Sequence, residues 1–267
     1  MEGKDISVVI ADEAIQVVQE ASEFDSLEKL KGHIVEDLLP QNSKQVRKRY
    51  AAILAKRLFV DDPYYSKSDE NPLNTPLLQC AENLSDTSLK FVIFYHYALS
   101  NKVLSTVLQD FFAPKLNDLD SVTESELEAF FKNKDISNEG RTTKDILRCL
   151  TQFNLLKKSG DDDNKYLCTG DHSLSAFVYC LHHELEEPRM YFVDDIRDSL
   201  TRRVCLLDDE TLQELIYDAW NADVWEYSFI SDMEQVKLRH SPEEISAELA
   251  RISESEADAG NTHMSST

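Results

Sequence analysis

The sequence predicts a mainly α-helical protein, on three observations. Glycine and proline are scarce, at 6 and 7 of 267 residues. Runs typical of strands are few, while Leu, Glu, Lys, Ala and Asp, most of them good helix formers, are common. A hydrophobic content of 42% is enough for a real core. We expect two helical subdomains, at 1–118 and 119–240, the second with a winged-helix-like β-hairpin, and a disordered acidic tail at 241–267.

Two helices are predicted at the start of the chain. Residues 7–21 repeat apolar side chains at helical spacing. A second helix begins at Ser26, which is a good N-cap residue, and Pro40 ends it.

The third predicted helix, NSKQVRKRYAAILAKRLFV at 42–60, is unusually basic. The whole chain has 28 Lys+Arg against 50 Asp+Glu and a net charge of −22. This segment has no acidic residue and six basic ones: Lys44, Arg47, Lys48, Arg49, Lys56 and Arg57. Helical spacing places Val46, Leu54 and Leu58 on an apolar side, and Arg57 points within that arc. Arg57 therefore needs a partner, a route to the surface, or a phosphate.

A loop rich in Pro, Asp, Asn and Ser is predicted at 61–76, before a long helix at 87–116. The helix is apolar almost all round at 91–99, so we expect it to be central and buried. A break is expected near Ser100–Asn101.

The order of the next segments is that of a winged-helix module. Thr123 caps a short helix at 124–134, and a second helix follows at 144–156. A β-hairpin is then predicted from Leu155–Lys158 and Lys165–Cys168, with a Ser-Gly-Asp turn between the strands.

This module offers a second set of cations: Arg141, Lys144, Arg148, Lys157 and Lys158. Its wing tip, Asp161–Asp163, would repel a phosphate backbone. Two uses of the module stay open, as a DNA contact or as a packing and protein interface. Two interpretations of the basic helix also stay open. It contacts phosphates, or its solvated face is paired with acidic residues of the same chain.

The C-terminal part is strongly acidic. Residues 173–186 predict a helix, 209–222 another, and 224–230 a strand. Between 186 and 236 the chain has 14 acidic and 4 basic residues. An alternative function is therefore a helical adaptor that binds other proteins. Trp220 and Trp225 lie in this segment and would be its interface anchors. The tail from Ser241 begins as a helix, and disorder is expected after Ile252.

No catalytic motif is present. The sequence has no GxSxG, no HExxH and no glycine-rich phosphate loop, so we predict no enzyme, no cofactor and no small-molecule substrate. Cys180, His182, His183 and Glu184 lie close in sequence, but no second ligand pair joins them. We therefore interpret them as ordinary residues of a helix and predict no metal site.

The remaining patterns predict a cytoplasmic protein. The five cysteines, Cys80, Cys149, Cys168, Cys180 and Cys205, are odd in number and never form a CxxC pair, which is typical of reduced thiols. No signal peptide is apparent. The longest apolar run, 91–99, is about half of a bilayer-spanning helix, so no membrane association is expected.

The order of four segments resembles a known family. These are SKQVRKRYAAILAKRL, SLKFVIFYHYALSNKVLSTVLQDFFAPKL, ESELEAFFKNK, and RTTKDILRCLTQFNLLKK with its hairpin. Over about residues 8–186 the chain is similar to BrxA, an accessory protein family of the BREX bacteriophage-defence systems. The resemblance implies a helical N-terminal bundle like that of NusB and a helical or winged C-terminal part. It also implies double-stranded DNA binding, other BREX proteins as partners, and no known catalysis.

Transferred to this sequence, the DNA-facing residues are the basic ones of 42–60, with Arg141, Lys144 and Arg148 behind them. The chain departs from the family pattern in its acidity and in about 80 residues beyond the matching region.

Overall fold

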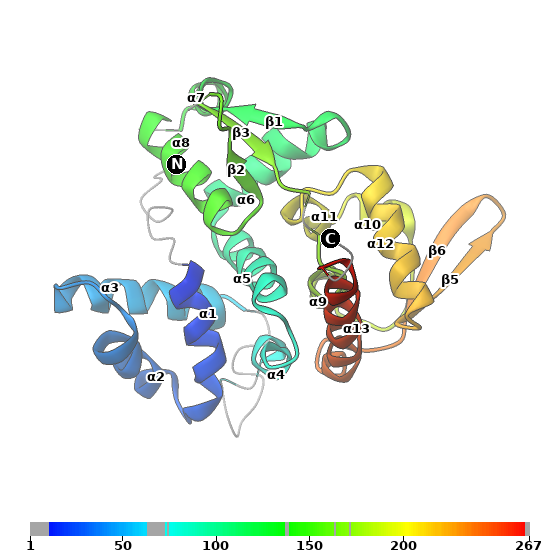
Figure 1. The fold of residues 1–267 in the computed structure, drawn as a ribbon, viewed down its shortest axis with the longest axis horizontal. Helices are drawn as coiled ribbons and strands as arrows, with labels where there is room; N and C mark the ends of the chain where they lie inside the picture. Colours follow the sequence, from blue (N-terminus) through cyan, green and yellow to red (C-terminus); the bar gives the residue numbers. More distant parts are fainter. Residues whose placement is uncertain are drawn as a thin grey trace.

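The computed structural model describes residues 11–62, 73, 75–136, 139–162, 164–170 and 172–264, with side chains of the last helix to Glu256. The predicted helix start at 7–10, the loop at 63–72 and Asp163 lie outside this set. The mainly helical fold is confirmed, with two small antiparallel sheets (Figure 1).

The N-terminal part is a set of helices packed around α5. Ser26 caps α2, and the helix break at Asn101 is confirmed because its side chain accepts hydrogen bonds from the first turn of α6. Phe91–Ala98 of α5 are buried, as predicted for a central helix. The helices, with the short turns that extend them, are α1 (Ala11–Glu20), α2 (Leu27–His33), η2 (Ile34–Leu38), α3 (Lys44–Ala55), η3 (Lys56–Val60), α4 (Pro76–Ala81), α5 (Asp86–Ser100), α6 (Lys102–Val107), η4 (Leu108–Phe112) and η5 (Ala113–Asp118).

The winged-helix-like module follows α6 and its extensions. An unpredicted strand, β1, precedes two helices, and the predicted hairpin completes a sheet of order β1-β3-β2. The capping box at Thr123 starts the first helix. The elements are β1 (Ser121–Thr123), α7 (Glu124–Asn133), α8 (Glu139–Gln152), β2 (Leu156–Lys158) and β3 (Lys165–Cys168).

The C-terminal part packs on the other side of α5. Its sheet has the order β4-β6-β5, and the hairpin β5–β6 projects from the body (Figure 1). The predicted strand at 224–230 is confirmed as β5, whereas β4 and β6 were missed. The elements are α9 (Leu174–Leu185), β4 (Met190–Phe192), α10 (Val193–Arg197), α11 (Leu200–Val204), α12 (Asp209–Asn221), β5 (Trp225–Ile230), β6 (Met233–Leu238) and α13 (Ser246–Met264).

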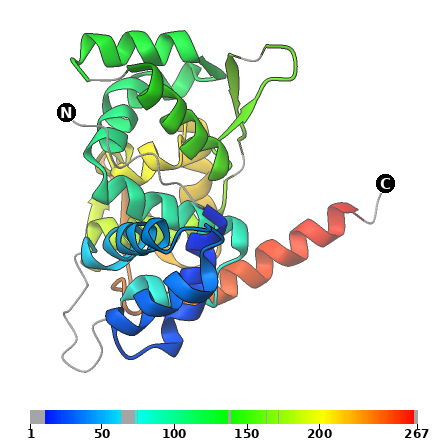
Figure 2. The same ribbon diagram turned by 90° about the vertical axis from the view of Figure 1, so that its left-hand side faces the viewer.

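The predicted disorder after Ile252 is wrong, because α13 continues to Met264 and reaches beyond the body (Figure 2). Ile245, Leu249 and Ile252 are buried. The Glu256 carboxylate accepts hydrogen bonds from the Leu174 backbone N–H and the Ser175 hydroxyl, at the start of α9. Contacts with α4 and α9 therefore stabilise a segment whose composition alone predicts no order.

One hydrophobic core joins all these parts, from Ala11 to Ile252. Helix α5 contacts α1, η3, α9 and α11, so it is shared by the two predicted subdomains. All five cysteines are free thiols, and four of them are buried. None of the described helices combines the length and the apolar character needed to cross a bilayer.

Candidate functional site

Between residues 141 and 150, the exposed face of α8 is made of basic side chains. Every exposed position there is basic: Arg141, Lys144 and Arg148. The other positions of this stretch are buried, with Ile146, Leu147 and Leu150 in the core. The spacing of three and then four residues aligns the cations in one stripe along the helix.

Most of this stripe is not neutralised by the protein itself. Arg141 Nε lies 3.8 Å from Asp145 Oδ2, in a pair one helical turn apart on the same helix. In the part of the chain that the structure describes, no ion pair joins Lys144 or Arg148 to a carboxylate. Exposed pairs such as Arg141–Asp145 are weak, so Arg141 also stays available to an external anion.

The hairpin beside α8 has a basic base and an acidic tip. Lys157 and Lys158 are exposed on β2. Asp161 and Asp162 are exposed at the turn, where Asp162 Oδ1 accepts a hydrogen bond from the Asn164 backbone. The tip would repel phosphates, so an anionic ligand is favoured only on α8 and at the base of the hairpin.

The basic face of α3 is partly neutralised. Lys44 Nζ lies 2.5 Å from Glu36 Oε1, and Lys56 Nζ lies 3.9 Å from Asp61 Oδ2. Arg47 Nη1 donates to the Gln41 carbonyl. Of the exposed cations on α3, Lys48 and Arg49 have no ion pair among the described residues. Figure 1 shows α3 beside α2 and α8 beside α7, so the two basic faces belong to separate parts of the molecule.

Arg57 does not belong to the surface. It is only 5% exposed, and its guanidinium lies 4.8 Å from the centroid of the Tyr97 ring. The π-helical turn η3 turns three consecutive residues, Arg57, Leu58 and Phe59, into the core. The prediction that Arg57 contacts DNA therefore fails in this conformation. The predicted inward position of Val46 is also wrong, since this side chain is 37% exposed.

The four residues considered for a metal site separate in space. Cys180 is buried, and His182 Nδ1–H donates to the Val178 carbonyl at 2.8 Å. Glu184 accepts hydrogen bonds from the backbone of Leu200–Thr201 at the start of α11. Only His183 reaches a cluster of metal-binding side chains.

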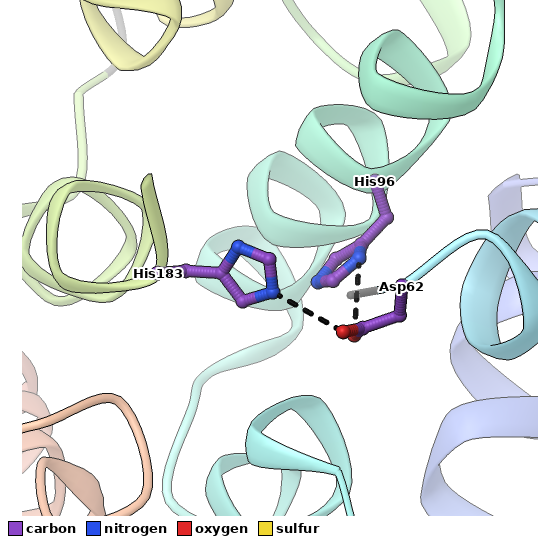
Figure 3. Close-up of side chains that lie close together, drawn as sticks. All are labelled: Asp62, His96 and His183. Carbon is purple, nitrogen blue, oxygen red and sulfur yellow. Dashed lines mark ion pairs between the residues drawn. The ribbon is translucent and has the colours of Figure 1, made fainter. Parts of the chain in front are cut away.

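That cluster is formed by Asp62, His96 and His183, in the core between η3, α5 and α9 (Figure 3). Asp62 Oδ1 lies 3.5 Å from His183 Nε2, and Asp62 Oδ2 lies 3.7 Å from His96 Nδ1. One ligand atom from each residue lies within 4.8 Å of the other two. All three side chains are 2% exposed or less.

Two tyrosines orient the histidine rings. A hydrogen bond of 3.0 Å joins His96 Nε2 to the Tyr179 hydroxyl, and one of 3.1 Å joins His183 Nδ1 to the Tyr95 hydroxyl. Burial lowers the pKa of His96 to about 3, against a smaller opposing effect of Asp62, so this ring is neutral. Burial and the Asp62 charge raise the pKa of Tyr179, which stays a hydroxyl.

The sequence did not predict this cluster, because its residues are far apart in the chain. Asp62 lies at the edge of a predicted loop, and His96 is a single polar residue in an apolar helix. His96, a histidine within an apolar helix, was the one feature of the sequence that pointed to the cluster. A histidine in such a position is ordinarily a hydrogen-bonded core residue, so it did not predict a site.

Comparison with known proteins adds no assignment. No protein-family model, no curated protein and no solved structure matches the chain. The resemblance to the BrxA family thus depends only on the order of the segments and on their residue patterns.

Proposed function

We propose that this protein binds double-stranded DNA through α8 of the winged-helix-like module. The observation that supports this most is the composition of the α8 surface, where Arg141, Lys144 and Arg148 occupy every exposed position from 141 to 150. In winged-helix and helix-turn-helix proteins the second helix of the pair enters the major groove. Helix α8 has this place in the module.

Charge distribution favours an encounter through this module. Residues 121–168 contain 8 basic and 9 acidic residues, so nearly all of the net charge of −22 lies elsewhere. The acidic remainder repels a duplex and leaves the module as the surface that faces it. Three phosphates neutralised by α8 would give a slope of about −2.7 in a plot of log affinity against log salt concentration.

The experiment compares charge reversals at matched net charge. The test variant is Arg141→Glu with Lys144→Glu and Arg148→Glu. The control variant reverses three exposed cations on separate elements outside the module, Lys29→Glu on α2, Lys102→Glu on α6 and Lys237→Glu on β6. Fluorescence anisotropy with a labelled duplex, over a series of salt concentrations, measures affinity. We expect the duplex affinity of the test variant to fall at least tenfold, and the remaining affinity to lose its dependence on salt concentration. The control variant should bind within about threefold of the wild type.

Two results would contradict the proposal: no duplex binding by the wild-type protein at low salt, or equal losses in the test and control variants. A separate double reversal, Lys48→Glu with Arg49→Glu, measures any contribution from α3. The resemblance to BrxA extends the proposal to an accessory, non-catalytic role in a BREX-type defence complex. Binding of purified BREX proteins to this chain tests that extension.

An adaptor function is the second candidate, supported by an exposed aromatic cluster between α12 and β5. The rings of Tyr217, Trp220, Tyr227 and Phe229 contact one another in tilted or edge-to-face arrangements, at centroid distances between 5.1 and 6.4 Å. Trp220 is 45% exposed and Phe229 is 61% exposed. Trp225, the other predicted anchor, is buried, and its indole N–H donates to the Ile216 carbonyl.

Acidic residues of the same region favour a cationic polypeptide as the partner. Glu214 and Asp218 are exposed on α12, and Glu214 lies one helical turn before both Tyr217 and Asp218. Aromatic faces attract Lys and Arg. A labelled Lys/Arg-rich peptide should bind the wild type and bind less to Trp220→Ser with Phe229→Ser. A Glu-rich peptide of equal length is the control, and equal binding of both peptides would eliminate this candidate. Point variants are required because α12 and α13 contribute to the core.

A further inference from the structure

We propose that Asp62, His96 and His183 form a binding site for a divalent metal ion, with zinc as the ion that fits best. This inference is independent of DNA binding. It depends on the spacing of three potential ligand atoms in the core and on the tyrosines that fix the rings (Figure 3).

The spacing of the three groups is that of metal ligands rather than of hydrogen-bonding partners. The two nitrogen–oxygen distances, 3.5 and 3.7 Å, are at or beyond the limit of a hydrogen bond. Zinc binds imidazole and carboxylate at about 2.0–2.2 Å, so two ligands of a tetrahedral ion lie about 3.4 Å apart. The two nitrogen–oxygen distances are close to this value, and the widest separation among the three ligand atoms, at most 4.8 Å, would shorten by about 1.4 Å or less on binding.

The orientation of the histidines agrees with this assignment. A metal-ligating histidine uses one ring nitrogen for the metal, while the other nitrogen hydrogen-bonds to a neighbour that fixes the ring. His96 presents Nδ1 to the carboxylate and bonds Tyr179 through Nε2. His183 presents Nε2 and bonds Tyr95 through Nδ1. Both rings therefore direct a nitrogen at the Asp62 carboxylate.

The chemistry of the ligand set selects the ion. Two imidazoles favour zinc and related transition metals over calcium and magnesium, which prefer oxygen ligands. A divalent cation would also offset the carboxylate charge of Asp62 in a low-dielectric core. With three protein ligands, zinc retains a fourth position for a water or another small ligand.

The position of the cluster indicates a structural role. Asp62 follows η3, the continuation of the basic helix α3, whereas His183 belongs to α9 of the C-terminal part. His96 lies on α5, between them. A bound ion would cross-link these three elements in the core, since all three ligands are shielded from solvent.

Metal analysis and cobalt substitution of the full-length protein test the proposal. Protein purified with zinc and freed of excess ion should retain about one zinc per chain. After chelator treatment and cobalt addition, we expect visible d–d absorption without the near-ultraviolet sulfur-to-cobalt band. That band would assign the ion to a cysteine such as Cys80 and overturn the proposal, as would the absence of bound metal from wild-type protein.

Matched variants locate the site. His183→Gln and Asp62→Asn should each lower zinc affinity at least tenfold. His182→Gln is the control, because His182 is also a buried histidine of α9 but bonds the Val178 carbonyl. Circular dichroism checks folding, and the wild-type cobalt spectrum decides the question if a variant does not fold. Zinc affinity that is equal in all three variants and the wild type would refute the assignment.

Discussion

Glu184 is predicted to be a major stabilising residue of the C-terminal part. Its carboxylate on α9 caps the start of α11, 16 residues further along the chain. Oε1 accepts from the Leu200 backbone at 2.6 Å, and Oε2 accepts from the backbone and hydroxyl of Thr201, both at 2.8 Å. Ser199 Oγ accepts a hydrogen bond from the Arg202 backbone N–H, so the backbone N–H groups of Leu200, Thr201 and Arg202 in the first turn of α11 all have acceptors.

Replacing Glu184 by Ala should lower the free energy of unfolding by about 3 kcal/mol. Loss of a helix cap costs about 1 kcal/mol, and a buried hydroxyl without a partner costs about 1–3 kcal/mol. The Thr201 side chain is buried, so water does not readily replace the carboxylate there. Glu184→Gln keeps one acceptor oxygen but places an amide donor against a backbone donor, and we expect about half of the Ala effect.

Urea unfolding followed by circular dichroism measures these differences. Glu187→Ala is the control, because Glu187 has a 72% exposed side chain whose ion pair with Arg189 is long, at 3.8 Å. This change should alter stability by less than about 0.5 kcal/mol. The reasoning is refuted if Glu184→Ala stays within 0.5 kcal/mol of the wild type, or if Glu184→Gln is the more damaging change.

Three further predictions concern other parts of the core. In chelator-containing buffer, lowering the pH from 7.5 to 5.5 should reduce the free energy of unfolding, and the two buried histidines should contribute about 3 kcal/mol to that reduction, because burial lowers the pKa of His96 to about 3 and of His182 to about 4. Only the unfolded chain then binds these protons, so a stability that rises on acidification contradicts the prediction. Asn101→Ala should cost about 1 kcal/mol and Asn101→Asp much less, since the side chain caps α6. Glu256→Ala should increase hydrogen exchange in α13, and unchanged exchange would show that this carboxylate does not hold the helix.

His33 modifies the pH dependence in the opposite direction. The carboxylate of Glu20, with a smaller effect of Asp37, raises the pKa of His33. Its contribution to stability is therefore present below the unfolded pKa of about 6.5 and is lost as the pH rises through the folded value. A His33→Asn variant should show the full acid sensitivity of the two buried histidines.

Much of the secondary structure could be predicted because its causes are local. The capping residues Ser26 and Thr123 and the break at Asn101 were placed correctly, since a cap depends on a few neighbouring backbone groups. The wing strands were also located by alternation and turn residues. Strand β4 was missed because its partner β6 lies far away in the chain, whereas β6 was missed although it forms a tight hairpin with β5.

Exposure was harder to predict than secondary structure. An ideal α-helical period pointed Arg57 within the apolar arc of the basic helix, yet Arg57 was assigned to the DNA-facing cations; the structure buries it on η3 beside Tyr97. Trp225 was expected at the surface of an acidic segment, yet the start of β5 packs it against Phe177 and His182. Neither outcome follows from composition.

The sequence by itself determined the helical fold, the winged module and the basic spacing on α8, because helical period and capping act over a few residues. Only the tertiary structure decided which cations remain exposed and unpaired, as the comparison of Lys48 with Lys44 shows. It alone brought Asp62, His96 and His183 together. Residues 34 and 87 positions apart meet only when α5 and α9 pack, and no local pattern encodes that contact.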